Sequence, residues 1–251
     1  MRAGQYSQNF NRIEIEICTG CNLRCLQCDR SSAQAPSKEL MTTGQIQSFV
    51  DESVRNNWLW YEIEVLGGEP TLHPDLLPIL ELLTEYCTFN RDCRIILVTN
   101  GHGEKVCEVL TRVPEDVRIE NTQKNEPNQI PFNDFNVAPI DFGGFAGDRY
   151  DRGCKIISEC GIGMTRYGYY PCGAGAGIDR VFGFDVGVNQ LAGLSDERLL
   201  EQRKLLCRYC GHYKGMNTEV RRETEMSNSW VDAYRNYKRH RPSLKPYDGE
   251  P

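Results

Sequence analysis

The chain has 251 residues, of which 39% are hydrophobic, and its 35 acidic and 29 basic residues give a net charge of −6. This acidic balance argues against sequence-independent nucleic-acid binding, and no apolar run approaches the roughly 20 residues that cross a bilayer. The N-terminus has no signal-peptide character, so we expect a cytoplasmic protein with no membrane partner. Because cytoplasmic thiols stay reduced, the 12 cysteines favour metal ligation over disulfides.

Strands and helices alternate in the first half of the chain. Alternating or apolar segments predict strands over residues 12–18, 61–66, 94–98 and 117–120. Between them lie three predicted helices: one that Thr42 or Thr43 caps and that runs to about Asn56, one over 76–86 and one over 105–111. Strands separated by helices in this way form parallel βαβ units, so the sequence predicts an α/β fold.

The second half is organised differently. Residues 121–150 are rich in Asn, Pro and Gly and show no helical period. A cysteine-rich region over 154–210 follows, with a predicted hairpin over 163–171 and a helix over 196–206, and a last helix is expected around 230–238. The glycine run over 173–177 suggests a flexible or closely approached loop.

The cysteines Cys21, Cys25 and Cys28 follow the first predicted strand with the spacing C-x3-C-x2-C. Three thiolates on one short loop can hold three irons of a [4Fe–4S] cube and leave the fourth iron open to a substrate. A fourth cysteine would close the cluster into an electron-transfer centre. A zinc knuckle or a set of buried thiols is the alternative, although zinc sites more often pair two C-x2-C halves.

Two further motifs follow the next two predicted strands. Gly67-Gly68-Glu69-Pro70 ends the second strand, and Thr99-Asn100 ends the third. Glycines let a ligand approach the backbone, and a carboxylate or an exposed carbonyl accepts hydrogen bonds from an ammonium group. Either motif is also compatible with an ordinary turn. Because active residues of βα barrels lie at strand ends, we expect both motifs and the cysteine loop to share one site.

Together these motifs resemble the radical S-adenosylmethionine (SAM) enzymes. The resemblance implies a partial (β/α) TIM-like barrel, a [4Fe–4S] cluster on Cys21, Cys25 and Cys28, and SAM as the ligand of the open iron. It further implies that the Gly-Gly-Glu-Pro element binds the methionine amino group and that Thr99-Asn100 contacts the ribose or the carboxylate. A flavodoxin or ferredoxin would supply electrons. The residue before the third cysteine is usually aromatic in this family, and here it is Gln27.

A second cysteine set resembles the twitch domain, a shortened SPASM extension that holds one auxiliary [4Fe–4S] cluster. The resemblance assigns the cluster to Cys154, Cys172, Cys207 and Cys210 and leaves Cys160 spare, as core, alternate ligand or hydrogen-atom donor. A structural zinc site on the same four thiols is the alternative. The remaining cysteines have no ligand spacing and are expected to be buried apolar residues: Cys18, Cys87, Cys93 and Cys107.

From these sets we predict a barrel over residues 1–145, a cysteine-rich extension of β-hairpin and helix over 146–215, and a C-terminal helix and tail over 216–251. The chain is similar to twitch dehydrogenases that oxidise an amino-cyclitol. We therefore expect oxidation of a small polar alcohol (a sugar, a cyclitol or a nucleotide-sugar-like molecule) with the auxiliary cluster as electron acceptor. A peptide maturase or an epimerase of peptides or sugars is the alternative. Arg152 and Asp148, just before Cys154, are the candidate catalytic residues.

Overall fold

The computed structural model describes residues 6–124, 134–145, 147–213 and 226–249. The centre of this part is a six-stranded sheet with the order β4-β3-β2-β1-β5-β6. Its strands are β1 (Arg12–Cys18), β2 (Glu62–Gly67), β3 (Arg94–Thr99), β4 (Val117–Asn121), β5 (Ile162–Thr165) and β6 (Gly168–Tyr170). Neighbours are parallel except β5 and β6, which form an antiparallel hairpin. The predicted α/β class is confirmed.

The connections between the parallel strands are helical. The helices are α1 (Thr43–Arg55), α2 (Leu76–Phe89) and α3 (Glu104–Leu110). Thr42 caps α1, because its hydroxyl accepts a hydrogen bond from Gln45 N while the Gln45 side chain accepts one from Thr42 N. This capping box fixes the start of α1 at Thr43.

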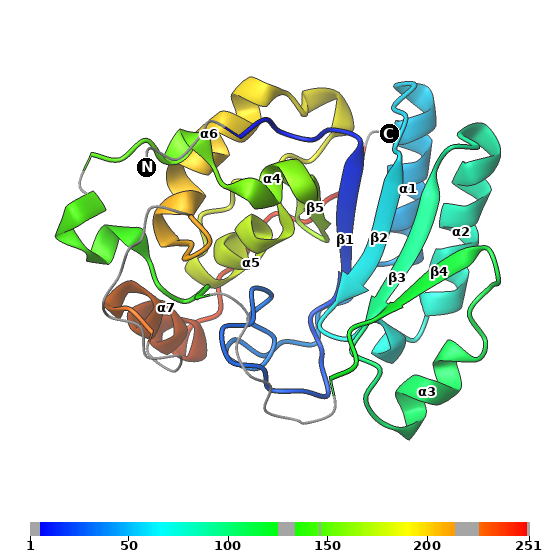
Figure 1. The fold of residues 1–251 in the computed structure, drawn as a ribbon, viewed down its shortest axis with the longest axis horizontal. Helices are drawn as coiled ribbons and strands as arrows, with labels where there is room; N and C mark the ends of the chain where they lie inside the picture. The colour runs from blue at the N-terminus through cyan, green and yellow to red at the C-terminus, as the bar shows by residue number, and fades with distance from the viewer. Residues whose placement is uncertain (1–5, 125–133, 146, 214–225, 250–251) are drawn as a thin grey trace.

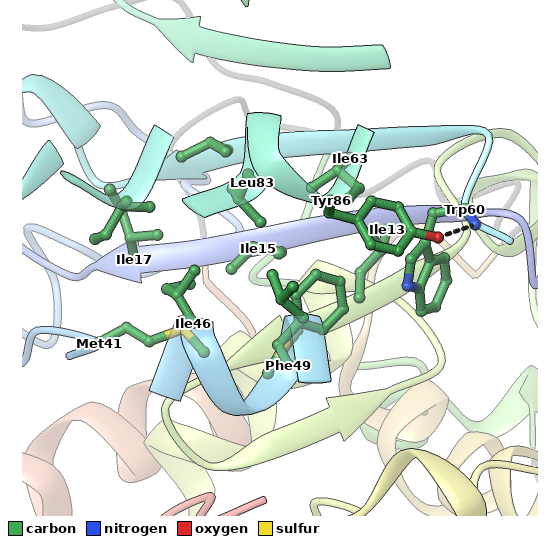
Figure 2. Close-up of a cluster of buried hydrophobic side chains, with 14 of the residues drawn as sticks. Ile13, Ile15, Ile17, Met41, Ile46, Phe49, Trp60, Ile63, Leu83 and Tyr86 are labelled. Atoms are coloured by element: carbon green, nitrogen blue, oxygen red, sulfur yellow. Dashed lines mark hydrogen bonds between the residues drawn. The ribbon is translucent and has the colours of Figure 1, made fainter. Parts of the chain in front are cut away.

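Strand β1 separates an apolar core from a charged surface. Its isoleucines pack on one face of the sheet against α1 and α2, whereas Glu14 and Glu16 point to the opposite face. We call that opposite face the inner face. On β2, Glu64 is the register partner of Glu14, and Leu66 is the partner of Glu16. Figure 2 shows the core side chains Ile13, Ile15, Ile17, Ile46, Phe49, Leu83 and Tyr86.

The second half of the chain covers the inner side of the sheet (Figure 1). Its helices are α4 (Lys155–Glu159), α5 (Gly173–Phe182), α6 (Asp196–Leu206) and α7 (Asn228–Arg239). The 3-10 helices of the described residues are η1 (Pro70–Leu72), η2 (Pro139–Asp141), η3 (Gly143–Phe145), η4 (Tyr150–Arg152), η5 (Leu191–Gly193) and η6 (Cys207–Tyr209). A second buried cluster, centred on Phe135, Trp230 and Tyr237, joins α5 to α7.

Several expectations need correction or fall outside the described residues. The run 173–177 is not a loop but the first half of α5, and its glycines allow close packing: a Cβ on Gly177 would lie 2.2 Å from the Asp29 carbonyl oxygen. Cys107 is exposed rather than buried, because it lies on the open side of the short helix α3. The domain boundaries placed next to residues 146 and 215 fall on residues that are not described.

The predicted hairpin is present as β5 and β6, and it extends the main sheet through β1 instead of forming a sheet of its own. Among the helices of the described residues, none has the length and apolarity that crossing a bilayer requires.

Candidate functional site: two cysteine-lined cavities

Cys21, Cys25 and Cys28 line one side of a cavity of about 180 Å³ at the carboxyl ends of β1, β2 and β3. Gly67, Gly68 and Asn100 also line this cavity, so residues of all three predicted motifs meet there. The other lining residues are Leu23, Asp29, Arg30, Ser32, Ala33, Leu66, Val98, Thr122 and Lys124. An open space next to three thiols suits a cluster whose fourth iron binds a further molecule.

The cysteine thiols of this cavity are poorly solvated. Burial raises the pKa of Cys21 to about 11, and burial also raises the pKa of Cys28. Leu23 N donates a hydrogen bond of 3.4 Å to the Cys21 sulfur, and Asn100 Nδ2 lies 3.8 Å from it. Thiolates at such a site need a bound cation to offset their desolvation, which is what iron provides.

The two glycines serve packing as well as access to the cavity. A Cβ on Gly67 would lie 2.4 Å from the Cys18 carbonyl oxygen, and one on Gly68 would lie 2.3 Å from the Gly20 carbonyl oxygen. Gly68 N donates to Cys18 O over 2.8 Å, and Glu69 N donates to Gly20 O over 2.8 Å. The glycines therefore let the end of β2 lie directly against the backbone that leads into the cysteine loop.

The Glu69 carboxylate is fully buried and already saturated with hydrogen bonds. Its Oε1 accepts from Thr71 N at 3.2 Å and from the hydroxyls of Thr71 and Thr99 at 2.7 Å each. Its Oε2 accepts from Asn100 N at 2.8 Å. Glu69, Pro70 and Thr99 are not among the described residues that line the cavity. Glu69 instead joins the loops that follow β2 and β3.

Asn100 is the residue of the third motif that reaches the cavity. Its Nδ2 donates to Asn22 Oδ1 over 2.8 Å, and Asn22 Nδ2 in turn donates to the His102 carbonyl oxygen over 2.7 Å. These bonds tie the cysteine loop to the loop after β3, so the two walls of the cavity hold a fixed separation.

The second set of cysteines also converges. Cys154, Cys172, Cys207 and Cys210 line a small cavity of about 20 Å³, whose other walls are mainly apolar side chains such as Ile157. Cys154 and Cys172 occupy the N-cap positions of α4 and α5, while Cys207 begins η6 and Cys210 is its C-cap. Three segments distant in sequence thus contribute cysteines to one cavity.

Desolvation by burial is the main influence on the pKa values of the four thiols at this second cavity. Burial raises the pKa of Cys172 to about 12, and burial raises the pKa of Cys154, Cys207 and Cys210 as well. Gly175 N donates a hydrogen bond of 3.3 Å to the Cys172 sulfur. Within the described ranges, no three His, Cys, Asp or Glu side chains are placed to hold one metal ion.

The two predicted catalytic residues lie elsewhere. Arg152 lines a separate cavity of about 300 Å³ together with Asp151, Asp196 and Arg203, and Asp148 is exposed. Neither is among the described residues that line either cysteine cavity. The structure thus brings together the seven predicted cysteine ligands in two groups but does not bring Arg152 and Asp148 to either group.

Sequence reasoning missed the charged inner face between the two cavities. Arg30 Nη2 donates to Glu14 Oε2 over 2.6 Å, and both residues are buried. Burial raises the pKa of Glu16 to about 7, and burial likewise raises that of Glu64 to about 7. The signal was the segment Ile-Glu-Ile-Glu-Ile, whose alternation puts carboxylates on the face that the core does not use.

The spare cysteine belongs to this inner face. Burial is the main reason that the pKa of the Cys160 thiol is raised, and the nearby carboxylates of Glu14 and Glu64 add to the effect. Cys160, which the resemblance leaves spare, is not among the described residues that line the second cavity.

Several solved and curated proteins are similar to parts of this chain. A 7-carboxy-7-deazaguanine synthase from Methanothermobacter thermautotrophicus is 30% identical over 105 residues, which are 40% of this chain and 39% of that protein. A GTP 3′,8-cyclase from Pasteurella multocida is 29% identical over 39% of this chain and 28% of its own. The chain therefore spans well under half the length of these relatives.

Two crystal structures show a weaker likeness. BtrN in complex with AdoMet and 2-DOIA is 17% identical, with a TM-score of 0.47 over 81% of this chain and 89% of that chain. Streptococcus suis SuiB bound to S-adenosylmethionine is also 17% identical, with a TM-score of 0.34 over 46% of this chain and 24% of that chain.

The Radical SAM superfamily model matches residues 15–120. This segment contains the cysteine loop, the Gly-Gly-Glu-Pro element and Thr99-Asn100, which are the three motifs that meet at the first cavity. The second cysteine set lies beyond the matched residues. Residues 15–120 of this chain are therefore the part that is similar to the radical SAM superfamily.

Proposed function

We propose that this protein is a radical SAM oxidoreductase that oxidises a small polar alcohol, with a second iron–sulfur cluster as electron acceptor. Cys21, Cys25 and Cys28 would hold the SAM-binding cluster, and Cys154, Cys172, Cys207 and Cys210 the auxiliary one. A sugar, a cyclitol or a nucleotide-sugar-like alcohol is the expected substrate class, and a flavodoxin or ferredoxin the expected electron donor.

One observation carries the proposal: four cysteines outside the radical SAM segment line one buried cavity. The helix that begins after Cys172 packs against the chain just past Cys28, because Gly177 of α5 lies against the Asp29 carbonyl oxygen. Both cysteine sets are therefore built on one packed body. An electron-transfer centre needs four ligands and no open position, and the four cysteines that line the second cavity support its assignment to this role.

The inner face supplies groups for a hydroxylated substrate. When bound, the two clusters and SAM supply the radical that removes a hydrogen atom from the carbinol carbon and the acceptor for the electron that then remains. The hydroxyl proton needs a base, and we assign this role to Glu16 or Glu64, whose pKa values burial raises to about 7, although neither is among the described residues that line the first cavity. Loss of one hydrogen atom, one proton and one electron converts the alcohol into a carbonyl group.

An iron count tests the proposal. The protein is purified without oxygen, reconstituted, and assayed for iron, sulfide and zinc per chain. About eight irons are expected, falling to about four when Cys21, Cys25 and Cys28 are all changed to Ala. A matched control changes Cys87, Cys93 and Cys107 to Ala, which also removes three thiols but leaves both cavities intact. About four irons that fall to none, or zinc at the second set, would remove the electron-accepting role.

Epimerisation is the second candidate, and the position of Cys160 favours it. A carbon radical can take a hydrogen atom from the Cys160 thiol, which leaves a thiyl radical that an electron from ferredoxin or flavodoxin and a proton restore. The charges of Glu14 and Glu64, on the inner face, and of Cys172, in the second cysteine set, act on this thiol. Cys160→Ala would abolish deuterium incorporation from D2O into product if this reaction occurs. Unchanged turnover in this variant would leave oxidation as the reading.

A further inference from the structure

The third cysteine of the first site lies between two residues of unusual backbone conformation. Gln27, directly before Cys28, has a φ of +56°, and Ser31, three residues after it, has a φ of +51°. Residues other than glycine rarely adopt such left-handed values, and they persist where the surroundings hold them in place. Both residues are buried, with Gln27 exposed to only 2% and Ser31 to 0%.

One hydrogen-bonded chain holds both strained residues. Gln27 Oε1 accepts from Asn136 N over 2.6 Å. The Asn136 side chain donates from Nδ2 to the Tyr234 hydroxyl over 2.8 Å, and that hydroxyl lies 2.8 Å from Ser31 Oγ. We call Gln27, Asn136, Tyr234 and Ser31 the loop clamp. It encloses Cys28 from both sides in the sequence.

The loop clamp is supplied from outside the radical SAM segment. Asn136 lies in the connection after β4, and Tyr234 lies on α7. Ser227 N, at the N-cap of α7, donates to Asn136 O over 3.0 Å, so the two suppliers are bonded to each other. Figure 1 shows the segment after β1 lying next to α7.

Helix α5 adds a second anchor to the same stretch. Arg180 donates to the carbonyl oxygens of Arg30 over 2.8 Å and of Ala35 over 2.9 Å. The backbone that follows Cys28 is thus fixed by α5, while the residues on either side of Cys28 are fixed by the clamp. Buried polar networks specify one conformation through the bonds that their members make, and in this one Asn136 Oδ1 and Arg180 Nε are left without a partner among the described residues.

We propose that Gln27, Asn136 and Tyr234 are positioning residues for the first metal site. Helix α7, which carries Tyr234, would then help to fix the conformation of the cysteine loop. The proposal rests on the proposed function, because it takes Cys28 as an iron ligand. It also accounts for a polar residue at position 27: an aromatic ring there could not accept the hydrogen bond from Asn136 N. Outer partners of this kind commonly change metal affinity by about 10–100-fold.

The test compares Tyr234→Phe and Gln27→Leu with Tyr247→Phe. Tyr247 is a matched control, since its buried hydroxyl donates to Glu52 Oε2 over 2.8 Å and lies in the C-terminal segment but not in the clamp. Each reconstituted protein is reduced, its electron paramagnetic resonance spectrum is recorded with and without SAM, and its loss of iron to a chelator is timed. Thermal midpoints are measured in parallel.

Both clamp variants should lose iron about tenfold faster than the wild type and show an altered SAM-induced spectral change. The double variant Gln27→Leu/Tyr234→Phe should add little, because one network is already broken. Tyr247→Phe should lower the thermal midpoint and leave the spectrum unchanged. Wild-type spectra and iron loss in the clamp variants, or equal changes in Tyr247→Phe, would overturn the proposal. If the wild-type protein binds no iron at Cys21, Cys25 and Cys28, the proposed function itself fails, whatever the clamp variants show.

Discussion

The two cysteine-lined cavities differ in what they leave open. The first has three thiols, polar groups such as Asn100 and Arg30, and about 180 Å³ of space. The second has four thiols, mainly apolar walls and about 20 Å³. One fewer ligand and room for a second molecule would suit chemistry at a metal, whereas four ligands in a small apolar site would suit electron storage and transfer. Under the proposed function, this contrast assigns different tasks to the two cysteine sets.

The largest effect should come from single ligands of the two cavities. Cys25→Ala removes a ligand of the open site and should abolish reductive SAM cleavage. Cys210→Ala removes a thiol of the second cavity only, so SAM cleavage should remain within about tenfold of the wild type. The measurement is 5′-deoxyadenosine formed with dithionite as reductant. Equal losses in both variants would mean that the two cavities do not divide the work.

A smaller effect, on stability, should come from adding a methyl group to the residue that lies between the two cavities. Gly173 begins α5 between them, and a Cβ there would lie 1.7 Å from Arg30 Nη1 and 2.4 Å from Glu14 Oε2. Gly173→Ala must displace this buried ion pair and should cost about 3 kcal/mol of unfolding free energy. Gly175→Ala is the matched control, because its nearest neighbour would be Leu206 at 3.4 Å. Thermal midpoints of both variants decide the point, and equal midpoints would contradict it.

Glu16 should make stability depend on pH. Its pKa rises from 4.5 to about 7 on folding, so the folded state binds the proton more tightly and loses stability as pH rises from about 4.5 through 7. Glu16→Gln should therefore be about 2–3 kcal/mol more stable than the wild type at pH 8 and nearly equal to it at pH 5. The charged groups that surround Glu16 are Arg30, Arg180, Asp29 and Glu39. Thermal midpoints at the two pH values test this prediction. A Glu16→Gln variant that is stabilised at pH 5 but not at pH 8 would contradict it.

The smallest effect should come from a change remote from both cavities. Thr42→Ala removes one half of the capping box at the start of α1 and should cost about 1 kcal/mol. Because α1 packs on the other face of the sheet, the iron content should stay at the wild-type value. A loss of iron in Thr42→Ala would show that global destabilisation, not local geometry, governs cluster occupancy.

The sequence predicted the parallel strands and the two groups of cysteines that line the cavities, since cysteine spacing and strand periodicity are local signals. It did not predict that residues 173–177 are helical, because glycine has a poor helix propensity and the compensating contact with Asp29 comes from distant sequence. The burial of Glu69 was also missed. The sequence Gly-Gly-Glu is the same whether the carboxylate contacts a ligand or, as here, accepts hydrogen bonds from Thr71 and Thr99.

The other features that the sequence did not predict depend on contacts between residues that lie far apart in the chain. The alternation in β1 was visible, but the use of its charged face depends on what lies opposite, and Arg30 and Cys160 come from separate loops. Gln27 was noted as a departure from the family pattern, yet its partner Asn136 is 109 positions away. No local signal connects two such residues, so their contact emerges only from the fold.

The central position of β1 has a consequence for dividing the chain. β1 is hydrogen-bonded to β2 on one side and to β5 on the other, with Ile13 paired to Ile162 and Ile15 to Met164. A fragment that ends before β5 would expose one whole edge of a strand rich in isoleucine. Unpaired edges of this kind recruit other chains, so such a fragment would self-associate even though it retains every motif of the radical SAM segment.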